Sequence, residues 1–196
     1  MTTANKITIL RILLVPFFVV QILYYVRTGN EVNRLLGLLA FAVAAILDGV
    51  DGYVARHYNQ RSELGTLLDP LADKLLLVSA IIVLSTDHSG RLGQIPLWVT
   101  GTIIGRDVLL GLGGIIVRMM VGKITIRPRI SGKVATVFQM VTVFWILLRW
   151  DFMYPAFWLR IWVLGAGILT GISGLFYVWD GTRQLSAHPS SSPITK

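Results

Sequence analysis

The stretch DGVDGYVARHYNQRSELGTLLDPLAD, residues 48–73, decides how the rest of the chain is organised. It contains four aspartates in two pairs. Asp48 and Asp51 are three positions apart, and Asp69 and Asp73 are four positions apart. Either spacing places both carboxylates of a pair on one face of a helix. The stretch therefore predicts two helices that each present a pair of carboxylates.

Both pairs adjoin apolar runs, at residues 35–47 and 75–84. A charged aspartate in the middle of a membrane helix costs about 2.5–3.5 kcal/mol on insertion scales, so four of them require a reason. Capping of helix ends, or pairing with Arg56, Arg61 and Lys74, accounts for one or two of them. Two same-face pairs favour a divalent cation, because hard cations bind carboxylate oxygens together with substrate phosphates.

Glycines and one arginine between the pairs fit the same interpretation. Gly52 and Gly65 have no Cβ, so backbone or ligand can approach closely there. Arg56, one helical turn after Gly52, can bind a phosphate with two parallel hydrogen bonds. The stretch as a whole predicts a metal and diphosphate site at the mouth of a helix bundle.

Composition indicates an integral membrane protein. Of 196 residues, 54% are hydrophobic and only 14% are charged, whereas a soluble domain of this size carries more charge. The net charge of +8 does not indicate nucleic-acid binding, because the basic residues are scattered among apolar segments. No cysteine is present, which excludes disulfides and thiolate metal sites.

The apolar segments predict an all-α, multi-pass membrane protein with six spans, since about 20 residues cross the hydrocarbon core. A polar turn at 27–34 and a polar loop at 54–64 separate the first three spans. The first span lacks a small-residue cleavage site and is expected to be retained. One membrane domain is expected at 1–185, followed by a disordered tail at 186–196. The six spans are expected at 7–26, 35–53, 65–85, 95–120, 134–148 and 156–178.

The distribution of Lys and Arg predicts the orientation. Six spans place both termini on one side, where ten basic residues would lie, against five on the other. This bias predicts that the termini and an active-site cavity face the cytoplasm, in a cytoplasmic or inner membrane. The ten are Lys6, Arg56, Arg61, Arg118, Lys123, Arg127, Arg129, Lys133, Arg183 and Lys196.

The spacing Asp48-x-x-Asp51-Gly52-x-x-Ala55-Arg56, then Gly65, Asp69 and Asp73, resembles the CDP-alcohol phosphotransferase family without a departure. The resemblance implies a membrane enzyme that transfers a substituted phosphate from a CDP-linked donor, here CDP-diacylglycerol, to an alcohol and releases CMP. It also implies that all four aspartates bind the metal, Mg²⁺ or Mn²⁺, with Asp73 as general base. A homodimer is implied by the resemblance alone.

The resemblance further implies a CDP-binding set, consisting of Asn5, Thr8, Gly52, Arg56, Ser62 and Gly65. Asn5-x-x-Thr8-x-x-Arg11 is similar to the opening of phosphatidyl-transferring members. The alternative interpretation is a helix cap followed by an arginine that snorkels to the membrane surface. For Ser62, an ordinary loop serine is the alternative.

The basic loop before the fifth span predicts a pocket for an anionic acceptor, lined by Arg118, Arg127, Arg129 and Lys133. Positive-inside charge is the alternative explanation of this loop. Ser131-Gly132-Lys133-x-x-Thr136-x-x-Gln139 resembles phosphatidylglycerophosphate synthases, with Ala135 where that group usually has lysine. Glycerol 3-phosphate is therefore the first expected acceptor.

The pair Arg106–Asp107 in the fourth span is interpreted either as a buried structural pair or as part of the site. Together with Ile130-Ser131, it also partly resembles cardiolipin synthases, whose acceptor would be phosphatidylglycerol. An inositol phosphate or another alcohol is the third expectation.

Two other classes of protein fit these motifs less well. A membrane prenyltransferase would carry its aspartate motifs on distant segments, whereas here both pairs fall within 26 residues. A cation transporter would place its carboxylates near the bilayer midplane on broken helices, rather than at helix ends beside a basic loop.

Overall fold

The computed structural model describes the backbone of residues 3–57, 63–86, 89–121 and 130–186. It describes the side chains of residues 8–48, 72, 74–86, 89–115 and 131–182. All regular structure in this part of the chain is helical, which confirms the all-α part of the predicted fold class. The elements are α1 (Thr3–Thr28), α2 (Glu31–His57), α3 (Glu63–Thr86), α4 (Leu97–Val121), α5 (Ile130–Leu147), α6 (Trp150–Met153) and α7 (Ala156–Ser186).

Each of the six expected apolar segments corresponds to one long helix, but the boundaries differ. The turn between α1 and α2 is only Gly29–Asn30, shorter than the predicted 27–34. Gly29 has a φ of +75°, and its N–H donates to the carbonyl of Tyr25 at 2.7 Å. Asn30 Oδ1 then accepts from the Val32 N–H at 3.0 Å. The glycine that ends α1 is therefore followed directly by the asparagine that caps the start of α2.

Several helices extend beyond their apolar segments. α2 continues through His57, and α3 begins at Glu63, so the prediction of a loop at 54–57 and 63–64 was wrong. α7 continues to Ser186, eight residues past the predicted end at Val178. Polar residues propagate a helix once it is nucleated, and periodicity of apolar residues does not reveal such extensions. The predicted tail from 187 onward lies outside the described residues.

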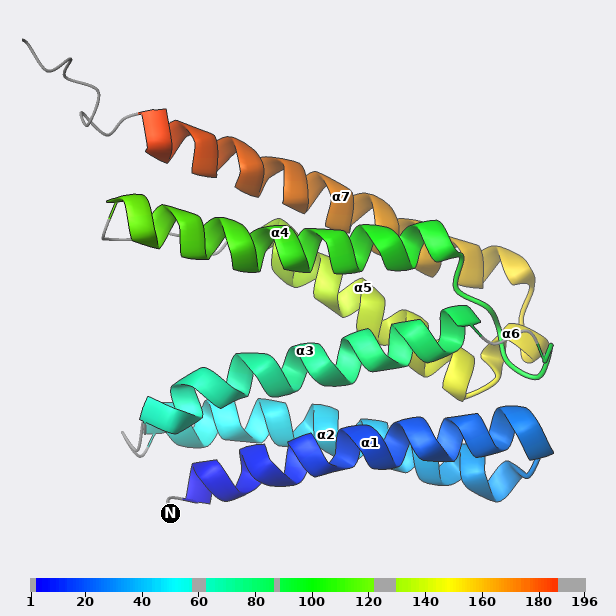
Figure 1. The fold of residues 1–196 in the computed structure, drawn as a ribbon. Coiled ribbons are helices and arrows are strands. Elements are labelled where there is room, and N and C mark those ends of the chain that lie inside the picture. Colours follow the sequence, from blue (N-terminus) through cyan, green and yellow to red (C-terminus); the bar gives the residue numbers. More distant parts are fainter. Residues whose placement is uncertain (1–2, 58–62, 87–88, 122–129, 187–196) are drawn as a thin grey trace, which may run out of the picture.

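The long helices form two groups (Figure 1). α1, α2 and α3 pack together, with the most extensive contacts between α1 and α2, and α4, α5 and α7 form the second group. α3 joins the groups through smaller contacts with α4 and α5. The start of α1, the end of α2 and the start of α3 lie at one end of the bundle, as do the ends of α4 and α7 (Figure 1). α6 and the short connections from α1 to α2 and from α3 to α4 lie at the other.

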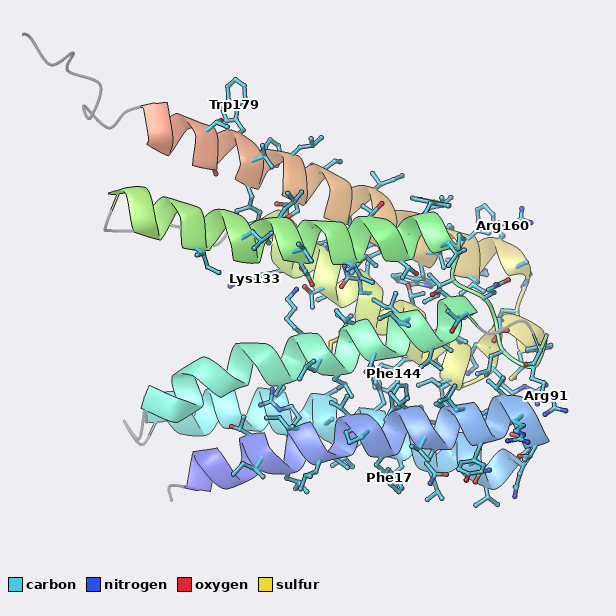
Figure 2. The ribbon with its side chains drawn as sticks, viewed as in Figure 1. Phe17, Arg91, Lys133, Phe144, Arg160 and Trp179 are labelled. Carbon is cyan, nitrogen blue, oxygen red and sulfur yellow. The ribbon has the colours of Figure 1, made fainter. Side chains whose placement is uncertain are left out.

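The interior combines an apolar core with buried charges, while the surface is apolar. Phe41 contacts Phe18 and Phe144, with ring centroids 5.6 and 5.0 Å apart. Arg11 is 1% exposed and Arg106 is 8% exposed, whereas large apolar side chains such as those of Phe17 and Trp179 are exposed (Figure 2). Soluble monomers rarely expose contiguous apolar surface on this scale. Buried charged side chains together with an apolar outer surface therefore indicate a lipid environment.

Helix length and composition agree with that environment. Thr8–Thr28 of α1 and Ala156–Thr182 of α7 are long and apolar enough to cross a membrane. The described parts of α3 and α5 contain shorter apolar helical stretches, Lys74–Thr86 and Ser131–Leu147. These findings support a membrane protein.

Arginine side chains form hydrogen bonds between helices at the end of the bundle where α1 connects to α2. Arg91 Nη1 donates to the carbonyls of Tyr25 and Val26, at 3.3 and 3.1 Å, and so caps the C-terminus of α1. Glu31 accepts from Arg34 Nε at 2.7 Å and from Arg149 Nη1 at 2.9 Å. Cations near helix C-termini are favourable because carbonyl groups there carry partial negative charge. These contacts close the end of the bundle that lies away from the aspartates.

Candidate functional site

The four aspartates belong to the two helices that meet at the open end of the bundle. Asp48 and Asp51 lie in the last turns of α2, and Asp69 and Asp73 lie within the first three turns of α3. The end of α2 and the start of α3 are adjacent there (Figure 1). The side chain of Asp48 is described, and those of the other three aspartates lie outside the described side chains. The fold thus brings both halves of the predicted metal site to one end.

Asp48 is held by an arginine from the neighbouring helix. Arg11 Nη1 on α1 donates to Asp48 Oδ1 at 2.7 Å. The Arg11 side chain is 1% exposed and that of Asp48 is 41% exposed. Arg11 therefore does not snorkel to a membrane surface, and that alternative was wrong. A buried guanidinium fixes one carboxylate oxygen while the carboxylate stays accessible to a ligand.

The predicted CDP-binding residues are only partly described. Thr8 is fully buried on α1, one turn before Arg11. Gly52 and Arg56 belong to α2, Gly65 belongs to α3, and Asn5 belongs to α1, all toward the aspartate end. The side chains around these four residues are not among those described, and Ser62 lies outside the described residues.

A second charged cluster links α3 to α4. Lys74, the residue after Asp73, donates from Nζ to both carboxylate oxygens of Asp107, at 2.7 and 2.8 Å. Arg106 Nη1 also donates to Asp107 Oδ1 at 2.7 Å. The sequence offers Lys74 as a partner for the aspartates of its own stretch; among the described side chains it pairs with Asp107, 33 positions away. Arg106 and Asp107 form a pair within α4, and Lys74 extends this pair to α3.

Arg106 is fixed on its other side by α5 and α7. Its Nη2 lies 3.4 Å from Ser173 Oγ, and its guanidinium carbon lies 5.9 Å from the centroid of the Tyr177 ring. Gly132 at the start of α5 leaves room for this arginine, because a Cβ there would lie 2.8 Å from Nη2. Arg106 Nε has no hydrogen-bond partner among the described residues. Arg106 is thus a buried cation that orients Asp107.

This cluster lines a cavity of about 560 Å³ between α3, α4, α5 and α7. Its polar lining comprises Lys74, Arg106, Asp107, Lys133, Thr136 and Tyr177. Lys133, predicted from sequence to bind an acceptor, lies between α4 and α3 in Figure 2. Arg118 belongs to α4 but its side chain is not described, and Arg127 and Arg129 lie outside the described residues. The charged lining residues described are three cations and one anion, which suits an anionic ligand.

Lys74 and Tyr177 were not among the predicted site residues. An aspartate and an arginine inside the apolar segment of α4 indicated that partners must exist, because uncompensated charge is costly in that setting. Which residues those partners are depends on how α3, α5 and α7 pack against α4. No periodicity or spacing in the sequence carries that information.

A divalent cation fits the donor set at the aspartate end. Within the described side chains there is no cluster of three or more His, Cys, Asp or Glu, since three of the four aspartates fall outside them. Asp48 nevertheless retains an accessible carboxylate, and its three companions lie on adjoining helix ends. Carboxylate oxygens are the preferred ligands of hard cations, which bind through few protein groups plus substrate phosphates.

Known proteins resemble this chain over most of its length. Residues 1–173 match the CDP-alcohol phosphatidyltransferase family. The probable phosphatidylglycerophosphate synthase of Mycobacterium tuberculosis (strain H37Rv) is 35% identical over 184 residues, 93% of this chain and 82% of that protein. The CDP-diacylglycerol--glycerol-3-phosphate 3-phosphatidyltransferases of Salmonella typhimurium (strain LT2) and Escherichia coli (strain K12) are each 34% identical over 189 residues, which cover 92% of this chain and 91% of each relative. The chain belongs to the CDP-alcohol phosphatidyltransferase family.

Proposed function

We propose that this protein transfers the phosphatidyl group of CDP-diacylglycerol to glycerol 3-phosphate, which yields phosphatidylglycerophosphate and CMP. The observation that carries the proposal is the cavity whose lining includes Lys74, Arg106 and Lys133, because Lys74 is the residue after the last aspartate. A phosphorylated acceptor there would lie next to the metal site. The printed names of the Salmonella and Escherichia relatives support the same donor and acceptor.

Asp48, Asp51, Asp69 and Asp73 would hold a divalent cation, Mg²⁺ or Mn²⁺. When bound, the cation neutralises negative charge on the diphosphate of the donor. Gly52 and Gly65 would allow the diphosphate close to the helix backbone, and the CDP moiety would also contact Asn5, Thr8, Arg56 and Ser62. The ion pair between Arg11 and Asp48 supports this role, because it would keep the Asp48 carboxylate in place.

The acceptor would bind in the cavity through Lys133, with Arg118, Arg127 and Arg129 contributed from the end of α4 and the segment before α5. Asp73 would remove the proton from the acceptor hydroxyl. The hydroxyl oxygen then forms a bond to the phosphorus that carries diacylglycerol. The bond between that phosphorus and the oxygen of CMP breaks, and CMP leaves with both bonding electrons.

Residues 1–185 would form one membrane domain in which the six long helices cross the bilayer. The basic residues gathered at the aspartate end would place the site and both termini in the cytoplasm, where soluble glycerol 3-phosphate is found. The acyl chains of the donor would remain among membrane lipids. The working unit would be a homodimer, as the family resemblance implies.

The test is an acceptor panel with purified protein in detergent, CDP-diacylglycerol and Mg²⁺. Glycerol 3-phosphate, phosphatidylglycerol, inositol phosphate and serine are offered separately, and CMP and lipid product are measured. Product with glycerol 3-phosphate alone, lost in Asp73→Asn, supports the proposal. Product with phosphatidylglycerol would instead identify a cardiolipin synthase. No nucleotide-dependent product with any acceptor would reject phosphatidyl transfer and favour a transporter.

A further inference from the structure

The ammonium group of Lys74 is the feature of the cavity that the proposed function leaves without a role. Its side chain is 42% exposed, although Nζ lies 2.7 and 2.8 Å from the two oxygens of Asp107. An ammonium has three N–H donors, and two contacts to a single carboxylate leave at least one donor for another partner. Lys74 is therefore held in place and still able to bind a ligand.

Asp107 is placed to orient Lys74 rather than to bind a ligand itself. The carboxylate accepts from Lys74 and from Arg106, and it is 15% exposed. Arg106 is 8% exposed and is held by Ser173 and Tyr177. A negative carboxylate already satisfied by two cations has little to offer an anionic ligand. Its effect is to fix the position of the more exposed cation beside it.

The position of Lys74 along α3 connects the cavity to the chemistry. Successive residues of an α-helix point about 100° apart, so Asp73 and Lys74 occupy neighbouring faces of one turn. A small acceptor whose phosphate contacts Lys74 can therefore place its hydroxyl on the side of Asp73. Lys133 lines the same cavity from α5, so two ammonium groups from different helices are available to one phosphate.

We infer that Lys74 binds the phosphate of the acceptor, a small phosphomonoester, and that Asp107 is the positioning residue that holds Lys74 there. This inference rests on the proposed function and assigns residues to its acceptor site. Among the described lining residues, the cations Lys74, Arg106 and Lys133 outnumber the anion Asp107, and this balance suits a doubly charged phosphate.

A double-mutant cycle tests the inference. Lys74→Met is expected to raise the KM for glycerol 3-phosphate about tenfold, the scale of one charge-assisted hydrogen bond, with the KM for CDP-diacylglycerol unchanged. Asp107→Asn is expected to raise the same KM about threefold or more. The double variant should be no worse than Lys74→Met, because Asp107 acts only through Lys74. Lys74→Arg, which keeps the charge, should retain most of the affinity.

Binding without turnover provides a second readout. Calorimetric titration of the detergent-solubilised variants with glycerol 3-phosphate, in the absence of CDP-diacylglycerol, should show the same loss of affinity. Glu31→Gln, which removes the ion pairs at the opposite end of the bundle, is the matched control and should leave both KM values unchanged. Thermal unfolding identifies any variant whose loss reflects misfolding, and Lys74→Arg then keeps the test decisive.

Three results would overturn the inference while wild type still makes phosphatidylglycerophosphate. They are an unchanged KM for glycerol 3-phosphate in Lys74→Met, additive effects in the double variant, and a lower KM in Asp107→Asn, which would mean that Asp107 competes with the acceptor. Wild-type protein that releases no CMP with glycerol 3-phosphate would instead reject the proposed function.

Discussion

Arg11 on α1 reaches Asp48 on α2 with a 2.7 Å hydrogen bond, although its own side chain is 99% buried. The guanidinium thus links the first helix directly to the first aspartate of the proposed metal site. Because the two residues are 37 positions apart, the contact exists only once α1 and α2 have packed. The Arg11–Asp48 contact therefore contributes both to the stability of the bundle and to the position of Asp48 in the site.

Arg11→Met should therefore impair both properties. A hydrogen bond between charged groups contributes about 1.5–3 kcal/mol, and partial exposure of Asp48 places the loss at the lower end. We expect a lower unfolding temperature in detergent and a higher Mg²⁺ concentration for half-maximal CMP release. Arg160→Met, which removes an exposed arginine of α7, is the control. Equal behaviour of the two variants would show that the Arg11 contact is dispensable.

Asp73→Asn should abolish most of the activity. An asparagine is nearly the same size but cannot accept the proton of the acceptor hydroxyl, and positioned bases contribute about 10²–10⁴-fold to rate. We expect a fall in kcat of that order, followed as CMP release under saturating substrates. Asp151→Asn makes the same chemical change at the opposite end, on α6, and should keep wild-type kcat. Retention of more than a tenth of the wild-type kcat in Asp73→Asn would contradict the assigned role.

Gly132→Ala tests the space that α5 leaves for Arg106. The added Cβ would lie 2.8 Å from Arg106 Nη2 and 3.4 Å from Ser173 Oγ, so the guanidinium must move. Since Arg106 orients Asp107, we expect a higher KM for glycerol 3-phosphate of about threefold to tenfold, the scale of a weakened charge-assisted hydrogen bond. Gly101→Ala on α4 has no atom within 4 Å of the added Cβ and should leave this KM unchanged. A normal KM in both variants would show that Arg106 adjusts without consequence.

Glu31 should make the far end of the bundle sensitive to acid. The hydrogen bond from Arg34 lowers the pKa of the Glu31 carboxyl, and the positive charges of Arg34 and Arg149 lower it further. A lowered folded-state pKa adds stability above the unfolded pKa of about 4.5, and that stability is lost as pH falls through the folded pKa.

Thermal unfolding of wild type and Glu31→Gln at pH 7 and below pH 4 measures this effect. Wild type should be the more stable at pH 7, and the difference should shrink in acid and in 1 M salt, because exposed charges are screened. A constant difference across this pH range would show that the Glu31 charge contributes nothing.

Local features of the sequence were sufficient to predict the helical class, the approximate position of each long helix and the two aspartate pairs. These features are local. Continuous apolar segments require helices in lipid, since every backbone group must be paired there, and a spacing of three or four places two carboxylates on one face. The same spacing carried the family resemblance, which the match over residues 1–173 confirms.

The packing of the helices determines which polar side chains meet. Three such contacts join residues that are far apart in the sequence. The separation is 37 positions for Arg11 and Asp48, 33 for Lys74 and Asp107, and 67 for Arg106 and Ser173. Such contacts depend on the rotation of each helix about its axis and on which helices are neighbours. Many rotations bury similar apolar surface, so apolar periodicity does not distinguish them. Buried charges distinguish them, because each one must find a partner, and packing determines which partner lies within reach.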